Sequence, residues 1–132
     1  MSADWVDDID QMHFKYGTGA AMLDMDKDKL KLFLEFRANF LQEELDELRS
    51  AKNADDVVDA LIDLCVVAIG TLDAFEVDAY KAWDAVLVAN MNKKVGVKAS
   101  RPNPLGLPDL VKPEGWVAPT HADNVGRLDE IF

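Results

Sequence analysis

The sequence predicts an all-α protein whose core resembles a four-helix bundle, and three observations support this fold class. Four segments space their apolar residues as amphipathic helices do, at about 3–16, 27–50, 54–75 and 78–93. The middle of the third segment is apolar nearly all round, as expected of a central helix. All five prolines lie after residue 101, where the helical periodicity has stopped. We therefore expect a helical core over residues 1–95 and an extended proline-rich arm over 96–132, packed on the core or on a neighbouring subunit.

The composition indicates one acidic domain. At 132 residues the chain is long enough to bury a single core, and it carries a formal net charge of −11 with a pI near 4.4. Nucleic acids and anionic membranes select basic surfaces, so neither is expected as a partner. No apolar stretch approaches the roughly 20 residues that span a bilayer, and the lone Cys65 rules out a disulfide within one chain. A soluble cytoplasmic protein is therefore expected.

The first helix is expected over residues 3–16, with acidic residues early in it, where the helix dipole favours negative charge. Gly17 and Gly19 are expected to end this helix. His13 is the residue here that suggests chemistry. A single histidine on a helix nevertheless packs or forms a hydrogen bond more often than it binds a ligand, so packing is the favoured interpretation.

Residues 24–35 resemble a calcium-binding loop only superficially. Lys29 occupies the sixth position of the pattern, where the sharp turn requires glycine. The apolar residues from Leu30 onward have helical spacing. Asp26 or Asp28 is therefore expected to cap the second long helix.

An acidic cluster lies near the end of this helix and contains Glu43, Glu44 and Glu47. Residues three and four apart share a helix face, so these side chains project as carboxylate pairs. Glu44 and Glu47 fall beside apolar positions rather than opposite them, where a solvated charge would not normally lie. Solvated glutamates on an exposed helix face are the alternative.

A second acidic cluster, with Asp59 and Asp63, lies in the apolar third helix after a turn near residues 50–53. Acids in such surroundings are rarely buried without a partner or a metal. If the two helices pack antiparallel, the two clusters face each other. They then form a cage of oxygen ligands suited to Mg²⁺ or Mn²⁺.

Positive charge is concentrated toward the C-terminus. Asn90, Lys93 and Lys94 lie within about one helical turn, so an amide and two ammonium groups can converge on phosphate oxygens. Lysines that complement the helix dipole are the alternative. In the proline-rich arm, Trp116 and several leucines favour docking on the body over a free tail, which would bring Lys112 toward the acidic cage.

These motifs, taken in order, resemble the MazG-like branch of the all-α nucleoside triphosphate pyrophosphohydrolases. The resemblance covers about residues 10–120. It rests on five stretches: HFKYG at 13–17, RANFLQEELDEL at 37–48, DALIDL at 59–64, NMNK at 90–93 and KPEGW at 112–116.

The resemblance implies a four-helix core that assembles as a homodimer or homotetramer and binds Mg²⁺ or Mn²⁺. The residues that it implies for catalysis are Glu43, Glu44, Glu47 and Asp63. Those that it implies for metal binding are Glu43, Glu44, Glu47, Asp59 and Asp63. Those that it implies for substrate binding are Arg37, Asn90, Lys93, Lys94, Lys112 and Trp116. The second acidic motif of the family usually has a glutamate where this chain has Ala60, so Asp59 is expected to substitute, and the number of metal ions stays open.

The implied reaction is hydrolysis of a (d)NTP to the (d)NMP and pyrophosphate. A purine such as (d)GTP is the expected substrate, as in phage-encoded members, which would act in the host cytoplasm. A phosphoribosyl-ATP pyrophosphohydrolase is the enzymatic alternative. The alternative of another class is a non-catalytic helical module whose acidic face binds a basic partner, and it requires Glu44 and Asp63 to face solvent.

Overall fold

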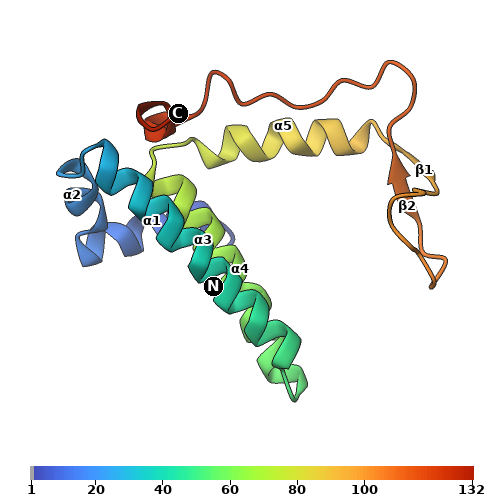
Figure 1. The fold of residues 1–132 in the computed structure, drawn as a ribbon, viewed down its shortest axis with the longest axis horizontal. Coiled ribbons are helices and arrows are strands. Elements are labelled where there is room, and N and C mark those ends of the chain that lie inside the picture. The colour runs from blue at the N-terminus through green and yellow to red at the C-terminus, as the bar shows by residue number, and fades with distance from the viewer. Residues whose placement is uncertain (1) are drawn as a thin grey trace. The chain divides into compact units, whose positions relative to one another are not determined.

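The structure, a computed structural model that describes residues 2–132, consists mainly of α-helices (Figure 1). Along this part of the chain lie α1 (Trp5–Tyr16), α2 (Thr18–Leu23), α3 (Lys27–Ser50), α4 (Ala54–Ala74) and α5 (Ala79–Met91). They are followed by two short strands, β1 (Lys94–Gly96) and β2 (Asp109–Val111), and the 3-10 helix η1 (Gly126–Glu130). The predicted all-α class is confirmed. No helix within residues 2–132 is long and apolar enough to cross a bilayer.

The chain forms two compact units. The first runs from the N-terminus to Ala79 and also includes Val125–Phe132, so it contains α1 to α4 and η1. The second is Tyr80–Asn124 and contains most of α5 and the β1–β2 pair. The division at residue 95 between a core and an arm stays a prediction.

α1 and α2 meet at Gly17, whose φ of 75° lies in the left-handed region. Glycine adopts this conformation without a steric penalty from a Cβ, which makes it a common end of a helix. At the other end of α1, the Asp4 carboxylate accepts a hydrogen bond from the Asp7 N–H at 3.0 Å. The prediction that Gly17 ends the first helix is confirmed. Gly19, by contrast, lies inside α2, a short helix that the sequence did not predict.

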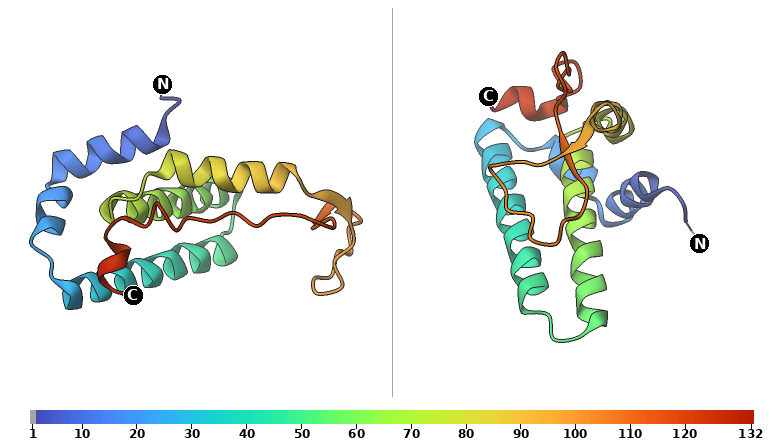
Figure 2. Two further views of the ribbon diagram at one scale, coloured as in Figure 1. Left: turned by 90° about the horizontal axis from the view of Figure 1, so that it is seen from above. Right: turned by 90° about the vertical axis from the view of Figure 1, so that its right-hand side faces the viewer.

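α3 and α4 form an antiparallel hairpin, and Figure 2 shows them side by side, joined by a tight turn. Side chains cap both helices at their N-termini. Asp26 accepts a hydrogen bond from the Lys29 N–H at 3.0 Å, and Asn53 accepts one from the Asp56 N–H at 2.8 Å. The predicted cap at Asp26 is confirmed, and the residues after it are helical rather than a calcium-binding loop.

The core of the first unit lies where α2, the beginning of α3 and the end of α4 meet. Its buried side chains are Met22, Leu30, Ala74, Phe75 and Ile131. The Phe75 ring is 1% exposed and packs on Phe33 with 5.6 Å between the ring centroids. Because Ile131 belongs to the C-terminal segment, burial of its side chain anchors that segment in the first unit.

Arg127 in η1 adds polar contacts to this anchor. Its main-chain N–H donates to the Phe75 carbonyl at 2.7 Å. Its guanidinium donates to the Met25 carbonyl at 2.9 Å and also to the Met22 carbonyl. These carbonyls lie near the ends of α2 and α4, where intrahelical donors are lacking. The C-terminal segment therefore joins two helix ends.

In the second unit, β1 and β2 pair antiparallel, with Lys94 opposite Val111, Val95 opposite Leu110 and Gly96 opposite Asp109. Arg101, in the loop between the strands, forms an ion pair with Asp109. The sequence did not predict these strands, because three residues are too few to show an alternating pattern.

Candidate metal centre and nucleotide site

Three carboxylates from α3 and α4 converge within the first unit. Glu44 and Glu47 come from α3 and Asp63 from α4, and one oxygen of each lies within 4.8 Å of the others. The two glutamates share a helix face because they are three residues apart. Glu44 is buried, at 7% exposed, whereas Asp63 is half-buried and Glu47 is exposed. The group therefore has a buried end and an end open to solvent.

Glu44 has the least favourable environment of the three acids. Its Oε2 atom is buried and has no hydrogen-bond partner among residues 2–132. Burial raises the pKa of Glu44, and the charges of Glu47, Asp63 and Asp59 raise it further. A negative charge at this point is unfavourable by itself and becomes favourable beside a cation.

The three acids fit a divalent cation that prefers oxygen ligands. Every donor in the group is a carboxylate oxygen, and Mg²⁺ and Mn²⁺ bind such donors. A divalent cation would also offset part of the negative charge of Glu44 and its neighbours. These features make the group a candidate metal centre.

Two other predicted ligands, Glu43 and Asp59, lie outside this group of three, and both are exposed. Asp59 is close enough for its charge to raise the pKa of Glu44. The contacts described for residues 2–132 do not bring Glu43 to the group. Ala60, at the position of the usual family glutamate, is 2% exposed. A buried methyl group therefore lies where a carboxylate is usual.

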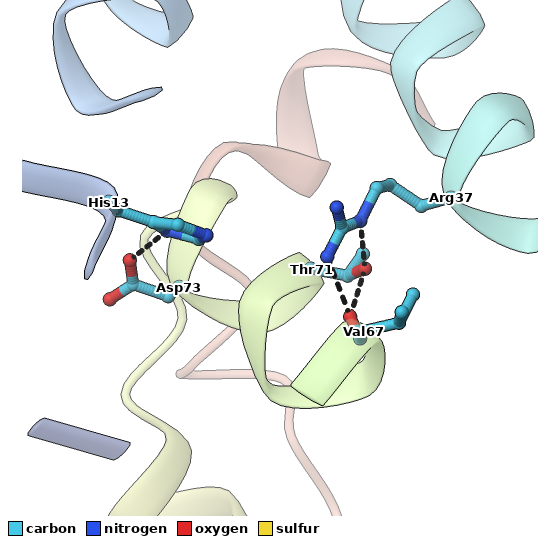
Figure 3. A network of polar contacts seen from close by, with 5 residues as sticks. All are labelled: His13, Arg37, Val67, Thr71 and Asp73. Atoms are coloured by element: carbon cyan, nitrogen blue, oxygen red, sulfur yellow. Dashed lines mark hydrogen bonds and ion pairs between the residues drawn. The ribbon is translucent and has the colours of Figure 1, made fainter. Parts of the chain in front are cut away.

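Arg37 connects α3 to α4 at a point one heptad before Glu44. Its Nε donates to the Thr71 hydroxyl at 2.9 Å, and its Nη2 donates to the Val67 carbonyl at 3.0 Å (Figure 3). The side chain is half-buried, and this burial lowers the pKa of Arg37. The substrate contact expected of Arg37 stays a prediction.

His13 and Asp73 form a pair that the sequence did not predict. The Nδ1 atom of His13 lies 2.7 Å from Oδ2 of Asp73, which joins α1 to α4 (Figure 3). The two residues line a pocket of ≈ 900 Å³ together with Tyr16 and Met22. The histidine itself was the available signal. Its partner could not be identified, because only the packing of α1 on α4 brings Asp73 to it.

The second unit brings together three of the predicted substrate-binding residues. The ammonium groups of Lys93 and Lys112 lie 5.3 and 5.0 Å from the ring centroid of Trp116, within the range of a cation–π interaction. The ring N–H of Trp116 donates to the Ala89 carbonyl of α5 at 2.7 Å. Trp116 therefore holds two positive charges near the end of α5.

A groove of ≈ 590 Å³ lies beside Trp116 and is lined also by Val88, Asn92 and Pro119. Of the two remaining predicted substrate-binding residues, Asn90 is exposed in α5 and Lys94 is exposed in β1.

One family model matches part of the chain. Residues 26–90, just under half of the chain, match the model of the phosphoribosyl-ATP pyrophosphohydrolase family. That family belongs to the MazG-like all-α nucleoside triphosphate pyrophosphohydrolase superfamily. Members of this family are hydrolases that act on phosphoric anhydrides, which confirms the predicted enzyme class. No curated protein and no solved structure matches the chain in the corresponding comparisons.

The matched segment begins at the α3 cap residue Asp26 and ends in α5 at Asn90. It includes all three acids of the candidate metal centre. The family match and the convergence of the carboxylates therefore concern the same α3–α4 hairpin.

Proposed function

We propose that the protein hydrolyses a purine (deoxy)nucleoside triphosphate, such as (d)GTP, to the monophosphate and pyrophosphate, with a divalent cation held by Glu44, Glu47 and Asp63. The observation that carries this proposal is the buried Glu44 carboxylate, which faces two further acids and has one oxygen unpaired among residues 2–132. Helix packing alone does not favour such an arrangement, since burying an uncompensated charge is costly. A bound cation makes it favourable.

The reaction consumes one water molecule for each nucleotide. The water oxygen attacks the α-phosphorus, the bond from this phosphorus to the oxygen bridging to the β-phosphorus breaks, and pyrophosphate leaves. A bound divalent cation supplies charge neutralisation and Lewis acidity for such a transfer. Glu43, the exposed residue that precedes Glu44 in α3, is the proposed group that orients the water and accepts its proton.

The proposed phosphate-binding groups belong to the second unit. Lys93, Lys94 and Lys112 carry the positive charge that a leaving pyrophosphate requires. Asn90 and the groove beside Trp116 are the proposed contacts for the rest of the nucleotide.

Pyrophosphate release tests the proposal. The eight common NTPs and dNTPs are incubated with the protein and Mg²⁺ or Mn²⁺, and both products are quantified. We expect release with a purine substrate and its loss in Asp63→Asn, because this variant removes one charged ligand. Asp55→Asn, at the exposed start of α4, is the matched control. Turnover by Asp63→Asn at the wild-type rate would exclude Asp63 from the site.

A second candidate substrate is phosphoribosyl-ATP, and the family match favours it directly. The same bond between the α- and β-phosphates is broken, so the same acids would serve. Parallel assays with phosphoribosyl-ATP, dGTP and dATP separate the two candidates by kcat/KM.

The proposed active form is a homodimer or homotetramer. Large apolar side chains are exposed on the chain, including Phe14 at 89% and Trp83 at 70% exposed, and association would cover such groups. Light scattering coupled to size-exclusion chromatography measures the mass in solution, and a monomer at all concentrations would contradict this part of the proposal.

A further inference from the structure

The facing surfaces of α3 and α4 repeat every seven residues. Seven residues advance a helix by nearly two full turns, so residues at this spacing form one row that drifts by only about 20° per repeat. The row on α3 contains Leu30, Arg37 and Glu44. The rows on α4 contain Ala60, Val67 and Ala74, and beside them Asp63 and Gly70. In the antiparallel hairpin, Arg37 lies against Gly70 and Glu44 faces Asp63.

The hairpin thus has two polar layers separated by one heptad, or about 10 Å along the helix at 1.5 Å per residue. One layer is the carboxylate group around Glu44. The other is Arg37 with Thr71 and the Val67 carbonyl. The Thr71 hydroxyl also donates to that carbonyl, at 2.7 Å, which fixes the direction in which it can accept from Arg37.

The Arg37 layer is closely fitted. A Cβ atom on Gly70 would lie 2.7 Å from Nη2 of Arg37 and 3.4 Å from Nε2 of His13. Figure 3 shows Arg37 and His13 approaching α4 from opposite sides. The rings of Phe33 and Phe40, on the flanking turns of α3, lie 5.8 and 5.5 Å from the guanidinium carbon. The guanidinium therefore fits one position on α4, the position that lacks a side chain.

Arg37 is a partly buried cation whose described hydrogen-bond partners are neutral. No carboxylate among residues 2–132 lies within ion-pair distance of it. Such a group contributes little to stability, because burial opposes its charge. Buried polar groups at helix interfaces are known instead to select one register over others.

We propose that Arg37 is a positioning residue that fixes the register of α3 against α4, so that Glu44 and Glu47 meet Asp63. This inference rests on the proposed function only in naming the acids as metal ligands. A slip of one residue rotates α3 by about 100° relative to its partner and turns Glu44 away from Asp63. The hydrogen bonds of Arg37 to Thr71 and Val67 exist in one register.

Metal affinity without nucleotide provides the first test. Free Mn²⁺ is measured by its electron paramagnetic resonance signal during titration of the wild type, Arg37→Met, Thr71→Val and Thr71→Ser. We expect Arg37→Met and Thr71→Val to raise the Kd for Mn²⁺ about tenfold, the scale observed when groups that orient metal ligands are removed. Thr71→Ser keeps the hydroxyl and should retain wild-type affinity. Arg49→Met, at an exposed position of α3, is the control.

Steady-state kinetics separates this role from a direct substrate contact. If Arg37 binds the nucleotide, Arg37→Met raises KM at saturating Mn²⁺, Thr71→Val has no effect, and neither variant changes the Kd for Mn²⁺ in the absence of nucleotide. This outcome would overturn the proposal. Circular dichroism verifies that each variant is folded.

A cross-linking measurement makes the inference independent of metal binding and of turnover. Glu44→Cys and Asp63→Cys are combined with Cys65→Ser, and a short bifunctional thiol reagent is added. We expect efficient cross-linking that is lost when Arg37→Met is included. Unchanged cross-linking would show that the register does not depend on Arg37, whatever the activity. If the wild type releases no pyrophosphate but Arg37→Met abolishes the cross-link, the result would count only against the proposed function.

Discussion

The carboxylates of Glu44 and Asp63 meet between α3 and α4, and the charge of Asp63 helps to raise the pKa of Glu44. Burial of Glu44 is the larger cause of this shift. In the metal-free protein at neutral pH, these two carboxylates and Glu47 therefore oppose folding locally. The same arrangement favours folding once a divalent cation is bound, because its two positive charges offset most of the negative charge of the three acids.

Replacement of Glu44 should change the pH dependence of stability. A folded pKa above the ordinary carboxyl value means that Glu44 stabilises the protein below that value, and that this contribution is lost as pH rises through the folded pKa. Glu44→Gln removes the effect. The Tm difference between the two metal-free proteins, taken as Glu44→Gln minus wild type, should therefore be larger at pH 7.5 than near pH 4.5. Thermal unfolding in a pH series measures this difference, with the exposed Glu35→Gln as the control. A difference that is constant with pH would contradict the prediction.

Divalent cations should stabilise the folded protein. A ligand that binds only the folded state at 100 times its Kd adds about 2.7 kcal/mol to the free energy of unfolding. Mg²⁺ or Mn²⁺ should therefore raise the Tm of wild type, and Asp63→Asn should lose most of this rise, since it removes a charged ligand. Differential scanning calorimetry with and without each cation provides the measurement. Equal rises in wild type, Asp63→Asn and the control Asp55→Asn would place the bound cation elsewhere.

The sequence was sufficient for features that depend on local chemistry. Gly17 ends α1 because a left-handed φ favours glycine. Asp26 caps α3 because the free N–H groups at a helix start favour a side chain that accepts a hydrogen bond. The convergence of Glu44 and Glu47 with Asp63 could also be predicted, because helix periodicity and a short turn constrain an antiparallel hairpin.

Features that depend on packing between distant segments could not be predicted. The pairing of His13 with Asp73 requires the angle between α1 and α4, which no spacing in the sequence specifies. Burial of Ile131 beside Leu30 requires the C-terminal segment to return to the first unit. The composition of residues 96–132 predicted an arm that docks on the core or on a neighbouring subunit, but no periodic pattern there indicated that Ile131 would be a buried contact.

Truncation of Ile131 should destabilise the first unit although the residue lies next to the end of the chain. Its side chain is 6% exposed and belongs to the cluster with Met22, Leu30 and Phe75. Ile131→Ala should lower the free energy of unfolding by about 2–5 kcal/mol, the usual range for isoleucine-to-alanine changes in a core. Urea denaturation measures this change in the free energy of unfolding. Phe132→Ala is the control, because Phe132 is 92% exposed and its loss should have almost no effect.

Alanine at Gly126 should be more destabilising than alanine at Gly17. Both glycines have positive φ, 52° and 75°, so a Cβ at either position costs about 1–2 kcal/mol in backbone strain. At Gly17 nothing lies within 4 Å of the added atom, whereas at Gly126 it would overlap the Phe75 carbonyl oxygen. That oxygen also accepts the Arg127 N–H, so relief of the overlap weakens the contact that holds η1. Gly126→Ala should therefore lower the free energy of unfolding by roughly 1–3 kcal/mol more than Gly17→Ala, the usual range for overpacking. Both variants are compared by urea denaturation, and equal losses would show that η1 can move away from α4 without cost.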